Sequence, residues 1–430
     1  MKVLFSAIGG TDPISNERDG SMLHICRVYR PDKVYLYLSK EMCQYHDKDD
    51  RYQRALTLLG QELGCSFQVE IIKDDKMEEV QIFDAFIDPF EKMLRDIRQK
   101  DQPTELLVNV SSGTPAMKSS LQMLSMLWNN IGAIQVSTPR KALNKHHEDK
   151  DDYDVEIQWM CDKDRTEEFE NRCIRSDAKL LLDRIRIENI QKFIMEYDYE
   201  AAKMMAKTLS VEPSEKFQDC LDIAVARSRL DIKYINGNRK KYQLQEWFPI
   251  VQDREMKEYE YLLVMQTKLL KKRYADFIRD VTPIFYSLSE KVLEKSCGLR
   301  FSDIGEEKEN GGWYLSLDKL QKQGIQIPAR WTSHTNISSY VILEILSEKC
   351  QESDLLNLME NIRKVERKVR NLAAHQIIGV TAEWIEKRTG FAPLQIMNMM
   401  FELAAHAGVN ISKKSRDIYQ VMNQDLISML

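Results

Sequence analysis

The spacing of hydrophobic and polar residues along this chain changes near residue 175. Up to that point short β-branched runs alternate with amphipathic stretches. Six runs predict strands: Val3–Ile8, Lys33–Ser39, Phe67–Lys73, Glu105–Val110, Ala133–Ser137 and Asp154–Met160. The spacing between most of them predicts helices: Asp19–Tyr29, Asp50–Leu63, Ile82–Gln99 and Pro115–Asn129. Such alternation predicts an α/β domain, a Rossmann-like parallel sheet with helices on both faces.

After Ser176 strand-like runs almost vanish, and helical spacing continues to Leu430. The predicted helices of this half span 180–210, 214–236, 254–275, 283–296, 338–349, 353–378, 381–389 and 391–407. Loops are expected at Asn236–Lys241 and Glu309–Gly312, and the densely charged Arg140–Asp152 segment is expected to be a solvated excursion. The sequence therefore predicts an α/β domain over residues 1–175 and an all-α helical domain over 176–430.

The composition narrows the class of protein. Of 430 residues, 43% are hydrophobic and 30% are charged, which is typical of a soluble globular protein. The formal net charge of −5 gives no overall attraction for nucleic acid, so any RNA contact needs a local basic patch. Eight scattered cysteines without a CxxC pair argue against a zinc site or a disulfide framework. Since no apolar run reaches about 18 residues, we expect a cytoplasmic protein without a membrane partner.

Two loops rich in small and hydroxylic residues follow the first and fourth predicted strands. In a doubly wound sheet ordered 3-2-1-4-5-6, these strands lie side by side where the winding reverses, and ligands bind above their carboxyl ends. The candidate ligand-binding residues of the two loops and of the helix that follows are Gly10, Thr11, Asp12, Asn109, Ser111, Ser112, Gly113, Thr114 and Lys118. The pattern predicts a ligand crevice at this switch point.

The second loop runs directly into a helix, with Thr114 before it and Pro115 at its first position. Backbone N–H groups at such a start favour an anion, and Lys118 adds a positive charge one turn inside. Neither loop matches GxGxxG or GxxxxGK[ST], which argues against a dinucleotide oxidoreductase and an ATPase. A structural interpretation stays open, in which Thr114 is only a cap and Gly9-Gly10 only a tight turn.

The predicted helix at 353–378 combines an apolar stripe with a basic flank. The stripe has the narrow spacing of helix pairing and consists of Leu355, Leu358, Ile362, Val365, Val369 and Leu372. Between Asn361 and Arg370 five residues are basic, and Glu366 is the one acid. A phosphate backbone is expected to follow this flank.

The segment Arg370-Asn371-Leu372-Ala373-Ala374-His375 ends this helix. Histidine moves a proton near neutral pH, and arginine is a fixed cation that binds phosphate. On a regular helix Arg370 and His375 point roughly 140° apart and lie about 7.5 Å apart along the axis. If the stripe is a dimer seam, copies from two chains can converge on one site. Alternatively, Arg370 is a solvated charge, and His375 interacts with the helix dipole.

Other arginine–histidine pairs with a similar spacing lie in segments that support a catalytic site less well. Arg18 and His24 belong to the first crossover segment, and the matches after Arg140 lie in the charged loop, where nothing holds their geometry. The Leu-Ala-Ala sequence before His375 recurs before His406 without the preceding arginine. His406 is therefore expected to be structural.

The Asn-x-Ser-Ser-Gly-Thr loop on an α/β domain, followed by Arg-Asn-x-x-x-His on a helix, resembles a known combination. Over essentially the whole chain it is similar to the CRISPR-associated accessory ribonucleases of type III-A systems, in which a CARF domain precedes a HEPN domain. The resemblance implies a homodimer whose CARF domains bind a cyclic oligoadenylate, expected to be the six-membered ring. Binding then activates cleavage of single-stranded RNA in the HEPN dimer.

Carried over by position, Arg370, Asn371 and His375 match the HEPN motif, and the two loops match the CARF ligand loops. The implied reaction needs neither metal nor cofactor: the RNA 2′-hydroxyl attacks the adjacent phosphate, His375 moves a proton, and Arg370 stabilises charge. Thr114 is the candidate for slow degradation of the activator. One rival is a CARF-type sensor that binds DNA and regulates transcription, which needs a helix-turn-helix. Another is a nuclease whose α/β domain senses nothing.

Overall fold

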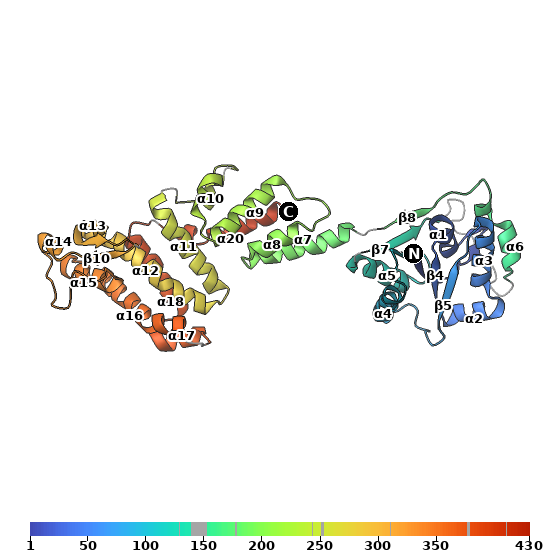
Figure 1. Cartoon of the computed structure of the whole chain (residues 1–430), viewed down its shortest axis with the longest axis horizontal. Helices are drawn as coiled ribbons and strands as arrows, with labels where there is room; N and C mark the ends of the chain where they lie inside the picture. The colour runs from blue at the N-terminus through green and yellow to red at the C-terminus, as the bar shows by residue number, and fades with distance from the viewer. Residues whose placement is uncertain are drawn as a thin grey trace. The chain divides into compact units, whose positions relative to one another are not determined.

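The chain forms two compact units, Met1–Asp183 and Arg184–Leu430, in a computed structural model (Figure 1). The structure describes residues 1–128, 130–138, 153–176, 179–242, 244–250, 253–309, 311–375, 379–409 and 411–430. The predicted boundary after residue 175 falls between the strand β8 (Cys173–Arg175) and the helix α7 (Lys179–Met195). The domain assignment itself stays a prediction.

A mixed sheet of six strands, counted over the described residues, forms the centre of the first unit. In spatial order its strands are β5 (Gln68–Asp74), β4 (Lys33–Ser39), β1 (Lys2–Ala7), β6 (Glu105–Asn109), β7 (Ile131–Val136) and β8. The first five strands are parallel, and β8 runs antiparallel to β7. The order 3-2-1-4-5 is confirmed for the first five strands. The sixth strand, β8, was not predicted, and because it runs antiparallel the expectation of an all-parallel sheet is wrong there.

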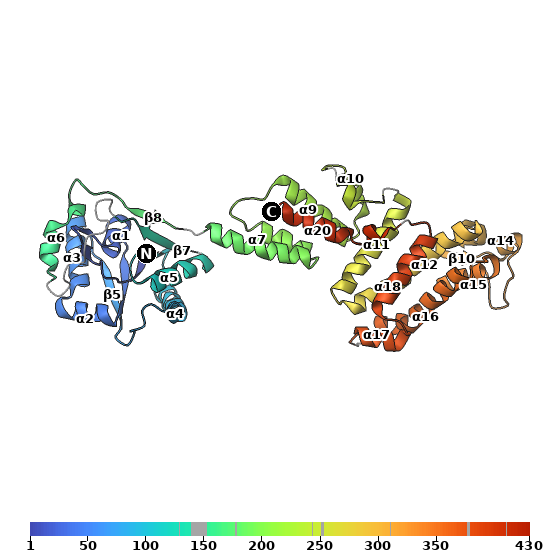
Figure 2. The same ribbon diagram turned by 180° about the vertical axis from the view of Figure 1, so that it is seen from behind.

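Alternating side chains along the strands supply two cores, one on each face of the sheet. Leu4 and Leu36 belong to one core, and Val3 and Phe5 belong to the other. The helices of the first layer are α1 (Ser21–Tyr29), α2 (Lys40–Asp49), α3 (Arg51–Leu63) and α6 (Val155–Cys161). The helices of the second layer are α4 (Asp84–Asp101) and α5 (Pro115–Leu127). Figure 2 shows the sheet between these layers.

The segment predicted as the strand Asp154–Met160 is the helix α6, so that prediction is wrong. Asp154 caps the helix by accepting a hydrogen bond from the Ile157 N–H (3.1 Å). Val155 and Trp159, four residues apart, are its buried positions. A short apolar run fits both a strand and a helix, and tertiary packing selects the helix here. The prediction also missed α2, and its charged excursion at 140–152 lies outside the described residues.

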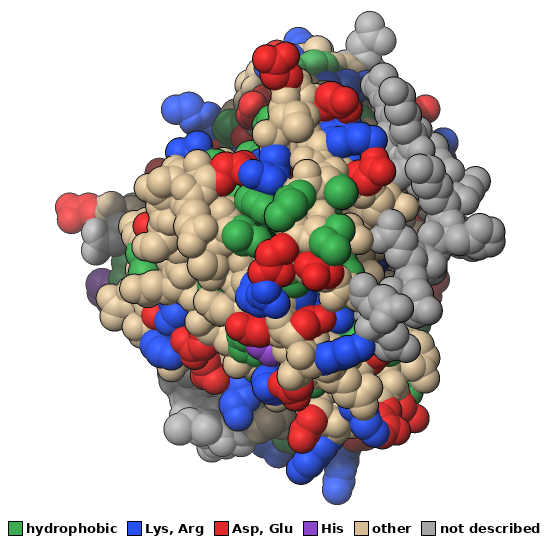
Figure 3. Space-filling model, turned by 90° about the vertical axis from the view of Figure 1, so that its right-hand side faces the viewer, with side chains coloured by type: hydrophobic (Ala, Val, Ile, Leu, Met, Phe, Trp, Pro, Cys, Tyr) green, Lys and Arg blue, Asp and Glu red, His purple; other side chains and the backbone are tan. Residues whose placement is uncertain are grey.

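A small hairpin and a 3₁₀ turn lie beside α1. The hairpin pairs β2 (Ile14–Ser15) with β3 (Arg18–Asp19), and the turn is η2 (Lys163–Arg165). The N–H of Asp19 donates to Asp164 (3.0 Å), which ties the hairpin to the turn. The face of this unit in Figure 3 mixes acidic and basic side chains around a small hydrophobic group.

The second unit is helical around one continuous hydrophobic core. Its elements after α7 are α8 (Tyr199–Ala206), α9 (Glu215–Ser228), α10 (Ile232–Asn238), η3 (Gln245–Trp247), α11 (Asp253–Leu270), α12 (Tyr274–Cys297), α13 (Phe301–Ile304), β9 (Gly305–Glu307), β10 (Trp313–Leu315), α14 (Leu317–Lys322), α15 (Ser339–Lys349), α16 (Ser353–His375), α17 (Ala382–Thr389), α18 (Pro393–His406), α19 (Lys413–Arg416) and α20 (Ile418–Ser428). The short β9–β10 hairpin is a departure from the predicted all-α domain.

Several helices of this unit begin or end at residues other than those predicted. The helix expected from 283 starts at Tyr274, because Pro283 lies inside α12, where a buried stripe continues on both sides of it. The single helix expected over 180–210 is broken after α7, and Tyr197 adopts a left-handed conformation (φ 56°). The loop expected at 236–241 is partly helical, because α10 extends to Asn238.

A buried ion pair joins two helices of this unit, and a ring from a third packs against it. The Arg227 guanidinium on α9 donates to Glu260 on α11 at 2.9 and 3.0 Å, and neither side chain is exposed. The rings of Phe248 and Tyr419 lie 4.8 and 4.6 Å from the guanidinium carbon. Because a buried charge without its partner is costly, this pair fixes how α9, α11 and α20 pack.

Candidate functional site

The two candidate loops lie at the carboxyl ends of neighbouring parallel strands, β1 and β6. Ser6 pairs with Asn109 in the register of these strands, so the loops that follow start side by side. Their backbones touch: a Cβ added to Gly9 would lie 2.6 Å from the Gly113 nitrogen. Gly113 itself adopts φ 81°, which favours glycine. The crevice expected at the switch point is thus built from two closely packed loops.

Asp12 holds the first loop in place rather than facing solvent. Its side chain is buried and accepts hydrogen bonds from the Gly9 N–H (3.1 Å), the Met22 N–H (3.0 Å) and the Ser112 hydroxyl. Loss of water on burial raises the pKa of Asp12, and these hydrogen bonds act in the opposite direction. Asp12 and Ser112 therefore join the two loops to each other.

Asn109 holds the second loop in place in the same way. Its amide nitrogen donates to Ser6 (2.9 Å) and Ser21 (3.2 Å), and its oxygen accepts from the N–H groups of Ser111 (2.9 Å) and Ser112 (3.3 Å). The side chain is fully buried. Because both ends of the amide are engaged inside the protein, Asn109 shapes the crevice floor.

The remaining candidates lie closer to the surface. The Ser111 hydroxyl accepts from the Val136 N–H (2.6 Å). Thr114 caps α5 by accepting from the Met117 N–H (3.3 Å), and its hydroxyl donates to the Val80 carbonyl (2.6 Å). Gly10 and Thr11 are exposed, and Lys118 is half-buried. The start of a helix such as α5 favours an anion.

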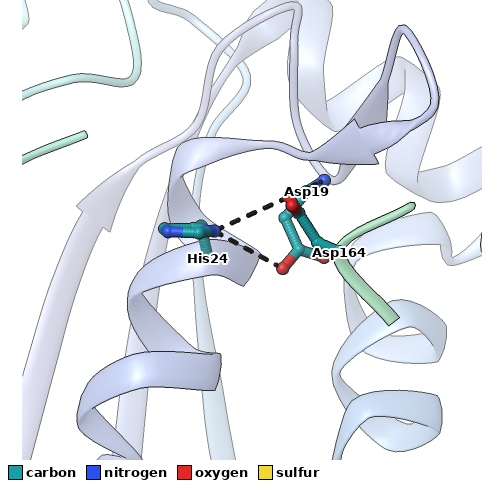
Figure 4. A group of neighbouring side chains, drawn as sticks. All are labelled: Asp19, His24 and Asp164. Atoms are coloured by element: carbon teal, nitrogen blue, oxygen red, sulfur yellow. Dashed lines mark hydrogen bonds and ion pairs between the residues drawn. The ribbon is translucent and has the colours of Figure 1, made fainter. Parts of the chain in front are cut away.

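A buried charge network that the sequence did not predict lies behind the crevice. His24 on α1 points between Asp19 and Asp164, and its Nδ1 is 3.7 Å from a carboxylate oxygen of each (Figure 4). The Arg172 backbone N–H donates to the other ring nitrogen, Nε2 (3.0 Å), and an Arg172 guanidinium nitrogen lies 3.2 Å from Nδ1. The Arg18–His24 spacing was visible in the sequence. Two residues that contact His24, Asp164 and Arg172, lie about 140 residues further along the chain, where no local pattern indicates them.

Three ligand atoms of Asp19, His24 and Asp164 lie within 4.8 Å of one another, as in a metal site. Guanidinium groups already occupy the cationic positions: Arg18 and Arg172 bind Asp164 at 2.8 and 2.7 Å. Burial acts to raise the pKa of Asp164, but hydrogen bonds from His24 and Arg18 and the charge of Arg172 hold it well below its ordinary value. We interpret this cluster as an ion-pair network that stiffens the crevice.

Helix α16 carries the catalytic candidates at its end. Its backbone is helical to His375, and the side chains of Arg370, Asn371 and His375 lie outside the described residues. The stripe residues that the structure describes are all buried: Leu355, Leu358, Ile362, Val365 and Val369. They belong to the core of this chain, so the idea that the stripe forms a dimer seam is wrong. A stripe of this width fits neighbouring helices of one chain equally well.

Of the four cations of the α16 basic flank whose side chains the structure describes, one is paired and three are exposed. Arg363 pairs with Glu366, which is buried and also accepts from the Ser339 hydroxyl (2.8 Å). The exposed cations are Lys364, Arg367 and Lys368. At about 100° per residue, positions 364, 368 and 375 fall within roughly 40° of one face of the helix. Exposed positive charge thus leads along α16 toward its end.

His406, which is expected from the sequence to be structural, lies at the end of α18. Its Nδ1 is 3.6 Å from Glu352, which agrees with a structural role.

Among the helices of the described residues, none has the length and apolar composition that crossing a bilayer requires.

Three family models match successive parts of the chain. They are described as the Cas_Csm6 CARF domain (residues 68–173), the CRISPR-associated protein Csm6 6H domain (176–228) and the Cas_Csm6 HEPN domain (247–427). The 6H region, which the sequence prediction did not separate, covers α7, α8 and α9 up to residue 228. The fold class predicted from the sequence, an α/β unit followed by a helical one, is confirmed.

Curated relatives match over most or all of their length. The CRISPR system endoribonuclease Csm6 of Streptococcus thermophilus is 30% identical over 100% of both chains. A second protein of that organism, Csm6′, is 32% identical over 75% of this chain and 80% of its own. The Csm6 of Mycobacterium tuberculosis is 27% identical over 100% of this chain and 98% of its own. In fold, the chain is similar to Enterococcus italicus Csm6 bound to cyclic hexa-2′-fluoro-hexa-dAMP (TM-score 0.74, 21% identity, 100% of both chains).

Proposed function

Since this chain belongs to the Csm6 family of CRISPR system endoribonucleases, we propose that it cuts single-stranded RNA when a cyclic oligoadenylate binds its CARF unit. The observation that carries this proposal is the order of its parts: a two-loop crevice on an α/β unit, then a basic helix that ends in Arg-Asn-x-x-x-His. The reaction serves antiviral defence in a type III CRISPR system, in the cytoplasm.

The proposed chemistry needs no metal. The RNA 2′-hydroxyl attacks the adjacent phosphate in line, and His375 transfers a proton, which typically contributes roughly 10²–10⁴-fold. Arg370 stabilises charge on the phosphoryl oxygens, and Asn371 orients one of these groups. The products are a 2′,3′-cyclic phosphate and a 5′-hydroxyl. The exposed cations Lys364, Arg367 and Lys368 bind the phosphates of the strand that leads to the scissile bond.

The active site is proposed to need two chains. Positions 370 and 375 face roughly 140° apart on α16, so one helix does not readily direct both side chains at a single phosphate. Two copies related by a twofold axis can place Arg370 of one beside His375 of the other. We therefore propose a homodimer, although the apolar stripe of α16 is buried within its own chain.

The activator is proposed to bind across the two crevices of the dimer. Its phosphates meet the loops at Gly10, Thr11 and Gly113, near the start of α5 and Lys118. The six-membered ring is preferred, since a solved relative of the same fold holds a cyclic hexanucleotide. Activation requires that the ring bind the cleavage-competent arrangement more tightly than the idle one.

Slow degradation of the activator is proposed as a second activity of the crevice. Thr114 is the candidate residue, because its hydroxyl lies at the start of α5, where ring phosphates are expected. That hydroxyl now donates to the Val80 carbonyl, so it must exchange this partner to act on a phosphate. Thr114→Ser should keep degradation, and Thr114→Val should abolish it while activator binding persists.

The proposal is tested by RNA cleavage in the presence of linear and cyclic oligoadenylates of four and six units, with and without EDTA. We expect cleavage to rise with the cyclic six-unit ring alone and to be unchanged by EDTA. Cleavage that is independent of every oligoadenylate would contradict the sensing role. Cleavage that EDTA abolishes would contradict the metal-free mechanism. A gel shift on duplex DNA tests the transcriptional-regulator alternative.

A further inference from the structure

Tyr340, at the start of α15, is a large aromatic side chain that remains 40% exposed. Its ring lies beside α16, because the guanidinium carbon of Arg363 is 5.6 Å from the ring centre. A second guanidinium, that of Arg330, lies 5.9 Å from the same centre. The remaining exposure means that the two cations do not cover the ring. An open aromatic surface therefore adjoins the helix that carries the catalytic candidates.

The ring is held in place before any ligand arrives. The Tyr340 hydroxyl donates to Glu344 (2.7 Å), which also binds Arg330. The start of α15 is fixed on α16 by Ser339, whose hydroxyl donates to the buried Glu366 (2.8 Å). A side chain that is already ordered loses little entropy when it binds a ligand, so these contacts favour binding on the exposed ring.

The charges around the ring are neutralised within the protein. Arg330 is paired with Glu344, and Arg363 is paired with Glu366. A phosphate needs uncompensated donors or positive charge, so this surface does not suit one. It offers instead the face of an aromatic ring, supported by two nearby cations. Every nucleobase has a face that stacks on such a ring.

The ring also lies in line with the catalytic arginine. Positions 363, 367 and 370 of α16 follow helical spacing and fall within about 60° of one face. Position 363, beside the ring, lies about 10 Å before position 370 along the axis. The exposed Arg367, proposed above to bind phosphate, stands between them. A strand whose phosphates follow this face toward position 370 passes the ring of Tyr340.

Resting on the function proposed above, we infer that Tyr340 is a stacking platform for a base of the single-stranded RNA substrate. The base belongs to a nucleotide a short distance from the scissile bond, and Arg367 binds the phosphate backbone between the two. An aromatic face combined with backbone-binding cations is typical of proteins that hold single strands without reading their sequence. The platform therefore adds affinity and positions the strand, whatever base it carries.

Binding of a fluorescent single-stranded RNA to the full-length protein, with cyclic hexa-adenylate present, tests the inference. The RNA has one mapped cleavage site, where a deoxynucleotide removes the attacking 2′-hydroxyl and prevents cleavage. We expect Tyr340→Ala to weaken binding about tenfold, the effect of losing one stacked base. Tyr340→Phe should bind as wild type, because the ring remains and only the hydrogen bond to Glu344 is lost. Tyr234→Ala, at a tyrosine of similar exposure (37%) on α10, is the matched control and should also bind as wild type.

A second measurement separates stacking from charge. The slope of log affinity against log salt should be the same in Tyr340→Ala as in wild type, because no phosphate contact is lost. A single abasic residue is then placed at successive distances from the cleavage site of the RNA. At one of these positions it should weaken binding by wild type about tenfold and have no further effect in Tyr340→Ala.

Wild-type affinity in Tyr340→Ala, or a reduced salt slope in that variant, would overturn the platform. So would a Tyr340→Phe variant as weak as Tyr340→Ala, since the hydrogen bond to Glu344 would then account for the loss. These outcomes leave activated cleavage by the wild-type protein intact. If the wild-type protein with its activator neither binds nor cleaves RNA, the proposed function fails together with the platform.

Discussion

Polar side chains in the crevice of the first unit mostly hold the protein together, whereas the cations on the exposed flank of α16 face outward. Asp12 and Asn109 are buried and use their hydrogen-bonding groups inside the fold. Arg367 and Lys368 are exposed. The difference teaches that the proposed ligand crevice offers backbone groups, whereas the proposed nuclease face offers charge that is not already neutralised.

The largest effect is expected at the end of α16. His375→Ala should lower activator-stimulated RNA cleavage by roughly 10²–10⁴-fold, because proton transfer to or from the reacting oxygens is lost. Activator binding should not change, since His375 lies in the other unit. His406→Ala is the matched control, with the same Leu-Ala-Ala sequence before it, and should cleave as wild type. Unchanged cleavage in His375→Ala would remove the catalytic assignment.

The second prediction concerns stability in the crevice. Asn109→Ala leaves the Ser111 and Ser112 N–H groups without their acceptor, at a cost of about 1–3 kcal/mol for a buried unsatisfied group. The melting temperature of the first unit should fall by roughly 4–8 °C for a loss of about 2 kcal/mol. Thr11→Ala, at an exposed position of the same crevice, should weaken activator binding without lowering the melting temperature. Melting curves and activator titrations separate the two outcomes, and the reverse pattern would break the comparison.

The third prediction uses pH to test the network behind the crevice. Burial, with the nearby charge of Asp19, raises the pKa of Asp162, the residue that caps η2, to about 8. The unfolded carboxyl loses its proton near pH 4, about four units earlier, so the unfolded state binds fewer protons between these values. Stability should therefore fall as the pH rises from about 4 to 8. Asp162→Asn should remove this dependence and raise the melting temperature at pH 8.5 by on the order of 2–4 °C, about 1 kcal/mol.

Asp164→Asn provides the opposite case. Because the pKa of Asp164 is held well below its ordinary value, the ionised form stabilises the fold at all pH values above about 4. This variant should melt earlier than wild type at both pH 6 and pH 8.5. If Asp162→Asn also melts earlier at pH 8.5, the ionised carboxylate stabilises the folded protein, and the raised pKa of Asp162 is wrong.

The smallest effect is expected from single cations on α16. Arg367→Ala should weaken RNA binding a few-fold and reduce the slope of log affinity against log salt by about 0.7, the value for one phosphate contact on a single strand. Arg363→Gln should leave this slope unchanged, because Arg363 is already paired with the buried Glu366. Equal slopes for both variants would mean that the exposed flank does not contact the strand.

The sequence by itself determined the order of the first five strands and the meeting of the two candidate loops at the switch point. Buried strands and amphipathic helices carry distinct periods, and the doubly wound order places the ends of β1 and β6 together, so Gly10, Asn109 and Thr114 could be named in advance. The helix that ends in His375 was equally visible, because its apolar spacing runs over about five turns.

Only the tertiary structure decided what those residues touch. The sequence did not reveal that Asn109 is saturated by internal hydrogen bonds, or that the α16 stripe is covered by its own chain. It also gave no sign that His24 lies between Asp19 and Asp164, because Asp164 is remote in sequence. Periodicity reports which side of an element is apolar. What covers that side, and which distant groups meet there, depends on contacts between segments that no local pattern records.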